Sequence, residues 1–112
     1  MAKISLDGIE TGRRIPARRG DVLSVRLDET PTSGYRWELD DHDAAVLAPE
    51  GDDFRPASGS TMGGGGTRQF RFKVIGSGTS PLKLVRRRPW DADSVAETFE
   101  ATIEAEEDEA ED

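Results

Sequence analysis

Few residues of this chain have the chemistry of a catalyst. There is no cysteine, and the one histidine, His42, stands within the run Asp40-Asp41-His42-Asp43. Nucleophilic catalysis needs a nucleophile beside a general base, whereas such a run of short polar residues is typical of a solvated turn. The acidic pairs Asp52-Asp53 and Glu106-Glu107 also lack a second group in a defined cleft, and the spacing falls short of a cation site. The sequence therefore predicts a protein that is not an enzyme and needs no metal or cofactor.

Three short segments have the composition of recognition loops. They are Thr30-Pro31-Thr32-Ser33-Gly34-Tyr35, Gly63-Gly64-Gly65-Gly66 and Arg88-Pro89-Trp90. Each lies between stretches that alternate apolar and polar residues, which is the pattern of β-strands, because successive side chains on a strand point to opposite faces. Loops carried on a rigid scaffold commonly bind another molecule. We therefore expect a binding protein.

The alternation predicts about seven strands and no long helix. Five stretches carry it through their apolar residues: Leu23, Val25 and Leu27; Tyr35, Trp37 and Leu39; Phe70, Phe72 and Val74; Leu82 and Leu84; and Phe99, Ala101 and Ile103. Ile4 and Leu6 mark a first strand, Phe54 a short one, and Ala44 to Leu47 a short helical turn. An all-β chain with this pattern is expected to fold as an antiparallel β-sandwich.

The order of the strands predicts where the three segments lie. With the strands lettered A to G, the segments become the B–C, D–E and F–G connections. If the strands run alternately up and down, every second connection emerges at the same end of the sandwich. The three segments are therefore expected to form one surface.

The first segment has a binding interpretation and a plainer one. Pro31 fixes one backbone torsion and Gly34 permits a positive one, so Thr32 and Ser33 could stand at a stiff, small polar tip that fits a narrow cleft. An ordinary turn has the same composition. Tyr35 begins the next alternating strand, so we expect it to anchor the core or its edge.

The second and third segments also leave alternatives open. Gly63 to Gly66 would let a partner approach the backbone, but a flexible linker is equally glycine-rich, and a phosphate loop would need the Gly-Lys-Ser/Thr ending that is missing here. Arg88 and Trp90 around the rigid Pro89 have the composition of an interface hot spot. Alternatively, Trp90 folds back onto the sandwich.

Charge is concentrated at the C-terminus. Residues 104–112 hold 7 of the 23 acidic residues. The rest of the chain therefore has 16 acidic residues against 15 Lys and Arg, a net charge of about -1 compared with -8 for the whole chain. We therefore expect one domain, residues 1–103, and a disordered acidic tail, residues 104–112. A near-neutral body lacks the broad positive field that nucleic-acid binding uses, despite arginine clusters such as Arg86 to Arg88.

Hydrophobic segments are short throughout. No run approaches the roughly 18 apolar residues of a membrane span, and the start, Met1 to Gly8, lacks the apolar segment of a secretory signal. We expect no membrane association. As written, the chain is expected in the cytoplasm, or outside the cell if a leader has been removed.

Taken together, the three segments resemble the chagasin-type inhibitors of papain-like cysteine peptidases. The family pattern is Asn-Pro-Thr-Thr-Gly-Tyr, then Gly-x-Gly-Gly, then Arg-Pro followed by Trp or Phe, and order and approximate spacing agree from about Leu6 to Ile103. The resemblance implies an immunoglobulin-like β-sandwich that inserts three loops into the active-site cleft of the peptidase. It also implies reversible competitive inhibition by a monomer, with the papain-like cysteine peptidase as partner.

The resemblance implies a role for each loop. The residues expected over the catalytic Cys and His of the peptidase are Pro31, Thr32, Ser33 and Gly34. The residues expected to border the non-primed subsites through their backbone are Gly63, Gly64, Gly65 and Gly66. The residues expected to pack on the primed side are Arg88, Pro89 and Trp90.

Two residues depart from the family pattern in the first loop. Thr30 replaces Asn and Ser33 replaces the second Thr. Both can hydrogen-bond nearby backbone groups, so the sequence retains the small polar tip. Threonine adopts positive φ poorly, so the sequence does not decide how the backbone of this loop is held. The competing interpretation is a noncatalytic immunoglobulin-like adhesion or scaffold module, which would keep the strands and would not need the three loops together.

Overall fold

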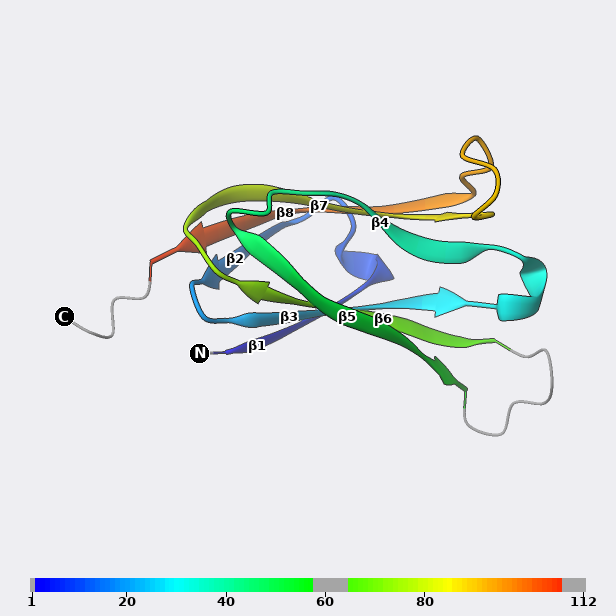
Figure 1. Ribbon diagram of the computed structural model, residues 1–112. Helices are drawn as coiled ribbons and strands as arrows, with labels where there is room; N and C mark the ends of the chain where they lie inside the picture. The colour runs from blue at the N-terminus through cyan, green and yellow to red at the C-terminus, as the bar shows by residue number, and fades with distance from the viewer. Residues whose placement is uncertain (1, 58–64, 108–112) are drawn as a thin grey trace.

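The computed structural model describes residues 2–57 and 65–107, which form two stacked β-sheets (Figure 1). The strands in this part of the chain are β1 (Lys3–Asp7), β2 (Arg14–Arg18), β3 (Val22–Glu29), β4 (Arg36–His42), β5 (Leu47–Pro56), β6 (Gly66–Val74), β7 (Gly78–Arg87) and β8 (Glu97–Glu106). Two short 3₁₀ turns are η1 (Gly8–Glu10) and η2 (Pro31–Ser33). Among these described residues there is no helix long and apolar enough to cross a membrane.

Each sheet has four strands, in the orders β1-β3-β6-β5 and β2-β8-β7-β4. This arrangement confirms the predicted β-sandwich. Most neighbouring strands are antiparallel, but β1 is parallel to β3 and β2 is parallel to β8. One strand is added to the predicted seven because the N-terminal segment divides: β1 joins one sheet, the chain reverses through η1 and Gly12 (φ 86°), and β2 joins the other.

The core consists of the alternating apolar residues that the sequence identifies. Along β3, for example, Leu23 and Val25 are fully buried and Leu27 is 4% exposed. The other strands contribute buried side chains at Trp37, Leu47, Phe70, Phe72, Val74, Leu82, Leu84, Phe99, Ala101 and Ile103. Since these side chains come from both sheets, the core lies between them, as the period of two predicts.

The strand directions bring the three recognition segments to one end of the sandwich. Strands β3, β5 and β7 end there, and β4, β6 and β8 begin there, on the right-hand side of Figure 1. The predicted parity of the connections is therefore confirmed. Gly63 and Gly64 lie outside the described residues, whereas Gly65 and Gly66 lie within them.

The segment around the histidine differs from its prediction. Asp40 to His42 belongs to β4 and not to a turn, because Asp41 pairs with Lys83 and a bulge before it keeps the strand in register with β7. The turn starts one residue later, at Asp43. The Asp43 carbonyl oxygen accepts hydrogen bonds from the amides of Val46 and Leu47 at 3.0 and 2.9 Å.

Two strands are longer than predicted. Phe54 lies in a β5 of 10 residues, because β6 pairs with both ends of that strand, on either side of a register shift between Pro49 and Asp52. Strand β8 continues past Ile103 to Glu106, into the segment expected to be a disordered tail. Pairing with β2 accounts for this extension, together with an ion pair between Arg14 and Glu104 at 2.6 Å.

A glycine at the end away from the loops tests this packing. A Cβ atom on Gly76 would overlap the carbonyl oxygen of Ala45, whereas a Cβ atom on Gly8 would meet nothing within 4 Å. We expect Gly76→Ala to lower the free energy of unfolding by roughly 2 kcal/mol, and Gly8→Ala to change it by less than about 0.5 kcal/mol. Urea denaturation followed by circular dichroism measures both. Equal effects of the two substitutions would contradict the packing described here.

Candidate functional site

The first loop, between β3 and β4, is closed by hydrogen bonds of Ser33. Its amide and its hydroxyl both donate to the carbonyl oxygen of Thr30, at 3.0 and 2.6 Å. The amide of Tyr35 donates to the same hydroxyl at 3.2 Å, and Gly34 precedes it at φ 83°. Thr32 and Ser33 are exposed. The small polar tip is therefore present, and Ser33, one of the two departures from the family pattern, fixes its backbone.

Thr30, the other departure, needs no unusual backbone. Within the described residues positive φ occurs only at glycines, so Thr30 avoids the conformation that threonine tolerates poorly. Its side chain turns towards the second loop, because a Cβ atom built on Gly65 would lie 3.3 Å from Thr30 Oγ1. The first loop is thus supported through the carbonyl group of Thr30, and its hydroxyl faces the neighbouring loop.

Beneath the first loop lies a buried carboxylate, that of Glu29, whose side chain is 1% exposed. Its Oε2 accepts from the amide of Trp37 at 2.8 Å, and its Oε1 accepts from Nε and Nη2 of Arg68 at 3.1 and 2.8 Å. The indole N–H of Trp37 donates to the carbonyl oxygen of Asp28 at 2.8 Å. Because Glu29 and Trp37 belong to different sheets, these bonds join the sheets directly below the loop.

Arg68 extends this network to β5. Its Nη1 lies 2.9 Å from Oδ2 of Asp52, and its guanidinium group lies 5.6 Å from the centre of the Phe54 ring. Burial lowers the pKa of Arg68, but its hydrogen bonds to Glu29 and Asp52 and their negative charges outweigh burial and raise the pKa. The guanidinium group therefore stays charged, and it compensates a carboxylate that would be costly to bury alone.

The second loop approaches the first through its backbone. The amide of Ala57 donates to the carbonyl oxygen of Gly65 at 3.1 Å, which joins the two limbs of the loop. A Cβ atom on Gly66 would overlap the carbonyl oxygen of Arg55, so the close pairing of β5 and β6 requires glycine there. A hollow of about 360 Å³ lies between the loops, lined by Thr30 and Gly65 among others.

The third loop, between β7 and β8, is held by Asp91 and Ser94. The Asp91 amide donates to the Arg88 carbonyl oxygen and the Arg88 amide to the Ser94 hydroxyl, both at 2.9 Å, and that hydroxyl donates to the Asp91 carbonyl oxygen at 2.7 Å. Trp90 is 74% exposed, so it does not fold back onto the sandwich. Its Cη2 atom lies 3.4 Å from where a Cβ atom on Gly34 would be, beside the first loop.

The residues that hold the loops in place were not predicted from the sequence. Glu29 and Arg68 occupy positions where the period of two would put an apolar residue: Glu29 follows Leu27 by two positions, and Arg68 precedes Phe70 by two. They could have been found by looking for a charged residue at a position where the alternation predicts a buried apolar side chain. Such a residue must have a partner, because an unpaired buried charge is unstable.

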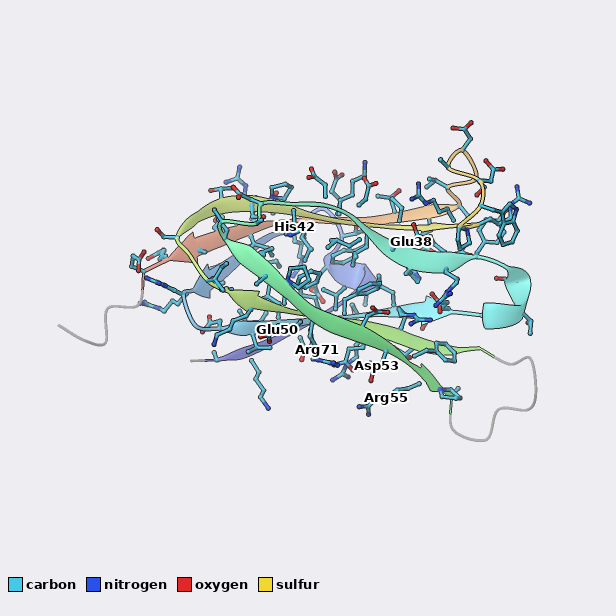
Figure 2. All side chains as sticks on the ribbon, viewed as in Figure 1. Glu38, His42, Glu50, Asp53, Arg55 and Arg71 are labelled. Carbon is cyan, nitrogen blue, oxygen red and sulfur yellow. The ribbon has the colours of Figure 1, made fainter. Side chains whose placement is uncertain are left out.

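The described residues contain no metal site, and the histidine lies away from the loops. No group of three or more His, Cys, Asp and Glu residues in this part of the chain could hold a metal ion. Figure 2 shows His42 near the end of β4 opposite the three loops. Asp53, a member of one acidic pair, lies 3.7 Å from both Arg55 and Arg71 in ion pairs. The three loops present hydroxyl groups, glycine backbone and an indole, which are groups that bind other molecules.

Fold and site together define a β-sandwich protein that presents three adjoining loops at one end. The family model described as "Chagasin family peptidase inhibitor I42" matches residues 17–104. The chain therefore belongs to the chagasin family of peptidase inhibitors and is not an enzyme. The family resemblance predicted from the three motifs is confirmed.

Individual relatives agree with this assignment. Chagasin of Trypanosoma cruzi is 27% identical over 88 residues, which are 74% of this chain and 79% of chagasin. The fold matches the cysteine protease inhibitor EhICP2 of Entamoeba histolytica with a TM-score of 0.84 at 20% identity, over 95% of this chain and 97% of that one. It matches PbICP-C, solved in complex with falcipain-2, with a TM-score of 0.70 at 14% identity, over 92% and 99% of the two chains.

The buried carboxylate gives a test of the support below the loops. In Glu29→Gln, an NH₂ group would replace one acceptor oxygen and leave Arg68 without its buried counter-charge. We expect the free energy of unfolding to fall by about 3 kcal/mol. The control is Glu97→Gln, where the carboxylate pairs with Arg86 but its side chain is 58% exposed, and less than about 1 kcal/mol should be lost. Similar losses in the two variants, measured by urea denaturation, would contradict a structural role of the buried pair.

Proposed function

We propose that this chain inhibits papain-like cysteine peptidases by filling the active-site cleft with its three loops. The observation that carries the proposal is the close approach of the loops to one another at one end of the sandwich. Thr30 of the first loop faces Gly65 of the second, and Gly34 of the first faces Trp90 of the third. A surface that is already assembled before binding loses little conformational entropy when it meets a cleft.

Each loop then has a place in the cleft. Pro31 to Gly34 would lie over the catalytic Cys and His, with the small side chains of Thr32 and Ser33 fitting the narrow space. Gly63 to Gly66 would border the non-primed subsites, where glycine lets the peptidase approach the backbone. Arg88 to Trp90 would pack on the primed side. An interface of the standard size, about 1,600 Å², would be enough for stable binding.

The proposed mechanism is reversible and competitive. The loops exclude substrate by occupying its space, and their described residues offer hydroxyl groups, amides, a guanidinium group and an indole, none of which forms a stable covalent bond with a thiolate. The hydrogen bonds that close the first loop hold its Thr30–Gly34 backbone in a turn and not in the extended form that a substrate needs. No scissile peptide would therefore be presented for attack.

Titration of papain with the purified chain tests this proposal. We expect inhibition that higher substrate concentration relieves and that dilution reverses, because the loops and the substrate compete for one cleft. Trypsin, a serine peptidase, serves as the control and should keep its activity. If a broad panel of papain-like peptidases were all unaffected, the scaffold-module interpretation would replace the proposed function.

Substitution of Trp90 should weaken inhibition without changing the stability of the fold. Because its side chain is 74% exposed, Trp90→Ala should leave the free energy of unfolding within about 0.5 kcal/mol of the unmodified chain. We expect the inhibition constant for papain to rise about 30-fold, as for an interface hot spot worth roughly 2 kcal/mol. Ile9→Ala is the matched control, since Ile9 is 80% exposed in η1, outside the three loops. An unchanged inhibition constant in Trp90→Ala would remove Trp90 from the binding surface.

A further inference from the structure

Two arginine side chains lie over the ring of Tyr35, the last residue of the first recognition segment. The guanidinium groups of Arg86 and Arg88 lie 5.6 and 5.5 Å from the ring centre. Tyr35 is half-buried and directly precedes β4, two positions before the buried Trp37. Aromatic rings attract guanidinium groups through the negative potential of their faces. The ring therefore contacts β7 and the third loop at once.

Each of these arginines is also tied to the third loop. Arg86 pairs with Glu97, the first residue after that loop, at 3.2 Å, and its carbonyl oxygen accepts from the amide of Ala96 at 2.8 Å. Arg88 reaches Asp91 at 3.4 Å. Both limbs of the third loop are thus connected through guanidinium groups to one tyrosine ring.

The neighbour of Tyr35 contacts the tip of the same loop. Gly34 has a φ of 83°, and a Cβ atom built on it would lie 3.4 Å from Cη2 of Trp90. A side chain at this position would meet the indole and adopt an unfavourable backbone conformation. The indole therefore rests against a glycine, while most of its surface stays open to solvent.

Among the described residues, the Arg88 side chain is only weakly restrained by hydrogen bonds and ion pairs. Its Nε is buried and has no hydrogen-bond partner among the described residues, and its single ion pair, with Asp91, is 3.4 Å long and 41% and 43% exposed at the two side chains. Exposed ion pairs of this kind contribute little. The face of the Tyr35 ring is therefore a main restraint on the position of the guanidinium group.

We propose that Tyr35 is a positioning residue, which acts through Arg88 and Arg86 to hold Trp90 in its binding orientation. It would not itself touch the peptidase. The proposal rests on the function proposed above. It adds that the first recognition segment orders the third loop as well as presenting the small polar tip. An exposed indole on an unrestrained loop would lose conformational freedom on binding, and the stacked arginines would remove part of that loss beforehand.

Substitutions at Tyr35 separate its ring from its hydroxyl group. Tyr35→Phe keeps the ring that carries both guanidinium groups, and we expect its inhibition constant for papain to stay within about twofold of the unmodified chain. Tyr35→Leu keeps an apolar side chain but removes the ring, and we expect about tenfold weaker inhibition, the size that two cation–π contacts imply. Equal inhibition by the Phe and Leu variants would overturn the proposal. Their melting temperatures are measured alongside, so that partial unfolding is recognised.

A double-substitution cycle distinguishes positioning from a general structural effect. A chain that already carries Arg88→Ala and Trp90→Ala lacks the side chain that Tyr35 is proposed to hold and one of the two arginines through which it acts. We expect Tyr35→Leu to change the remaining inhibition by less than about twofold there. If it still weakened inhibition tenfold, Tyr35 would act by another route, and the proposal would be wrong.

A measurement on the free protein tests positioning without any peptidase. A Cβ atom built on Gly34 would lie 3.4 Å from Cη2 of Trp90, so the α-protons of Gly34 are near the indole, and we expect their NMR signals to carry a ring-current shift that disappears in Trp90→Ala. We expect Tyr35→Leu to remove most of this shift and Tyr35→Phe to keep it. A shift that is unchanged in Tyr35→Leu would overturn the proposal. This result does not depend on papain, so failure of the proposed function and failure of positioning are distinguishable.

Discussion

The ion pair between Glu29 and Arg68 is the interaction on which the site depends. One carboxylate, almost without access to solvent, binds the backbone of β4 and a guanidinium group from β6, and that group continues to Asp52 on β5. Both sheets and the first two loops therefore meet at a single pair of charges. A buried pair of this kind is not a strong source of net stability, but either charge left alone would be costly, so the arrangement admits few alternatives.

A second and more exposed polar cluster lies below the loops on the other sheet. Arg86 pairs in register with Trp37 and with Glu97, which puts both charges on the core side of the second sheet, above the apolar residues. The guanidinium groups of Arg86 and Arg88 both lie within 5.6 Å of the centre of the Tyr35 ring. The core thus ends, below the three loops, in paired charges and not in apolar side chains. The hydrogen bonds between paired charges are directional, so these pairs can fix the positions of the loops above them.

The sequence predicted the fold better than the support of the site. The period of two in Leu23, Val25 and Leu27 and in the later strands predicts the sandwich and the shared end of the loops, because it depends only on local chemistry. The extent of β8 depends on pairing with the distant β2, and His42 is held in β4 by a bulge that no local pattern shows. Glu29 and Arg68 lie 39 positions apart, so only the folded chain reveals that they meet.

A crystal structure of this chain bound to papain, compared with one of the free protein, would show whether the three loops enter the active-site cleft. We expect Thr32 and Ser33 to lie over the catalytic Cys, Trp90 to lie on the primed side, and the described backbone of the three loops to move by less than about 1 Å between the two states. Contact through the opposite end of the sandwich, or loops that take up their positions only in the complex, would contradict it.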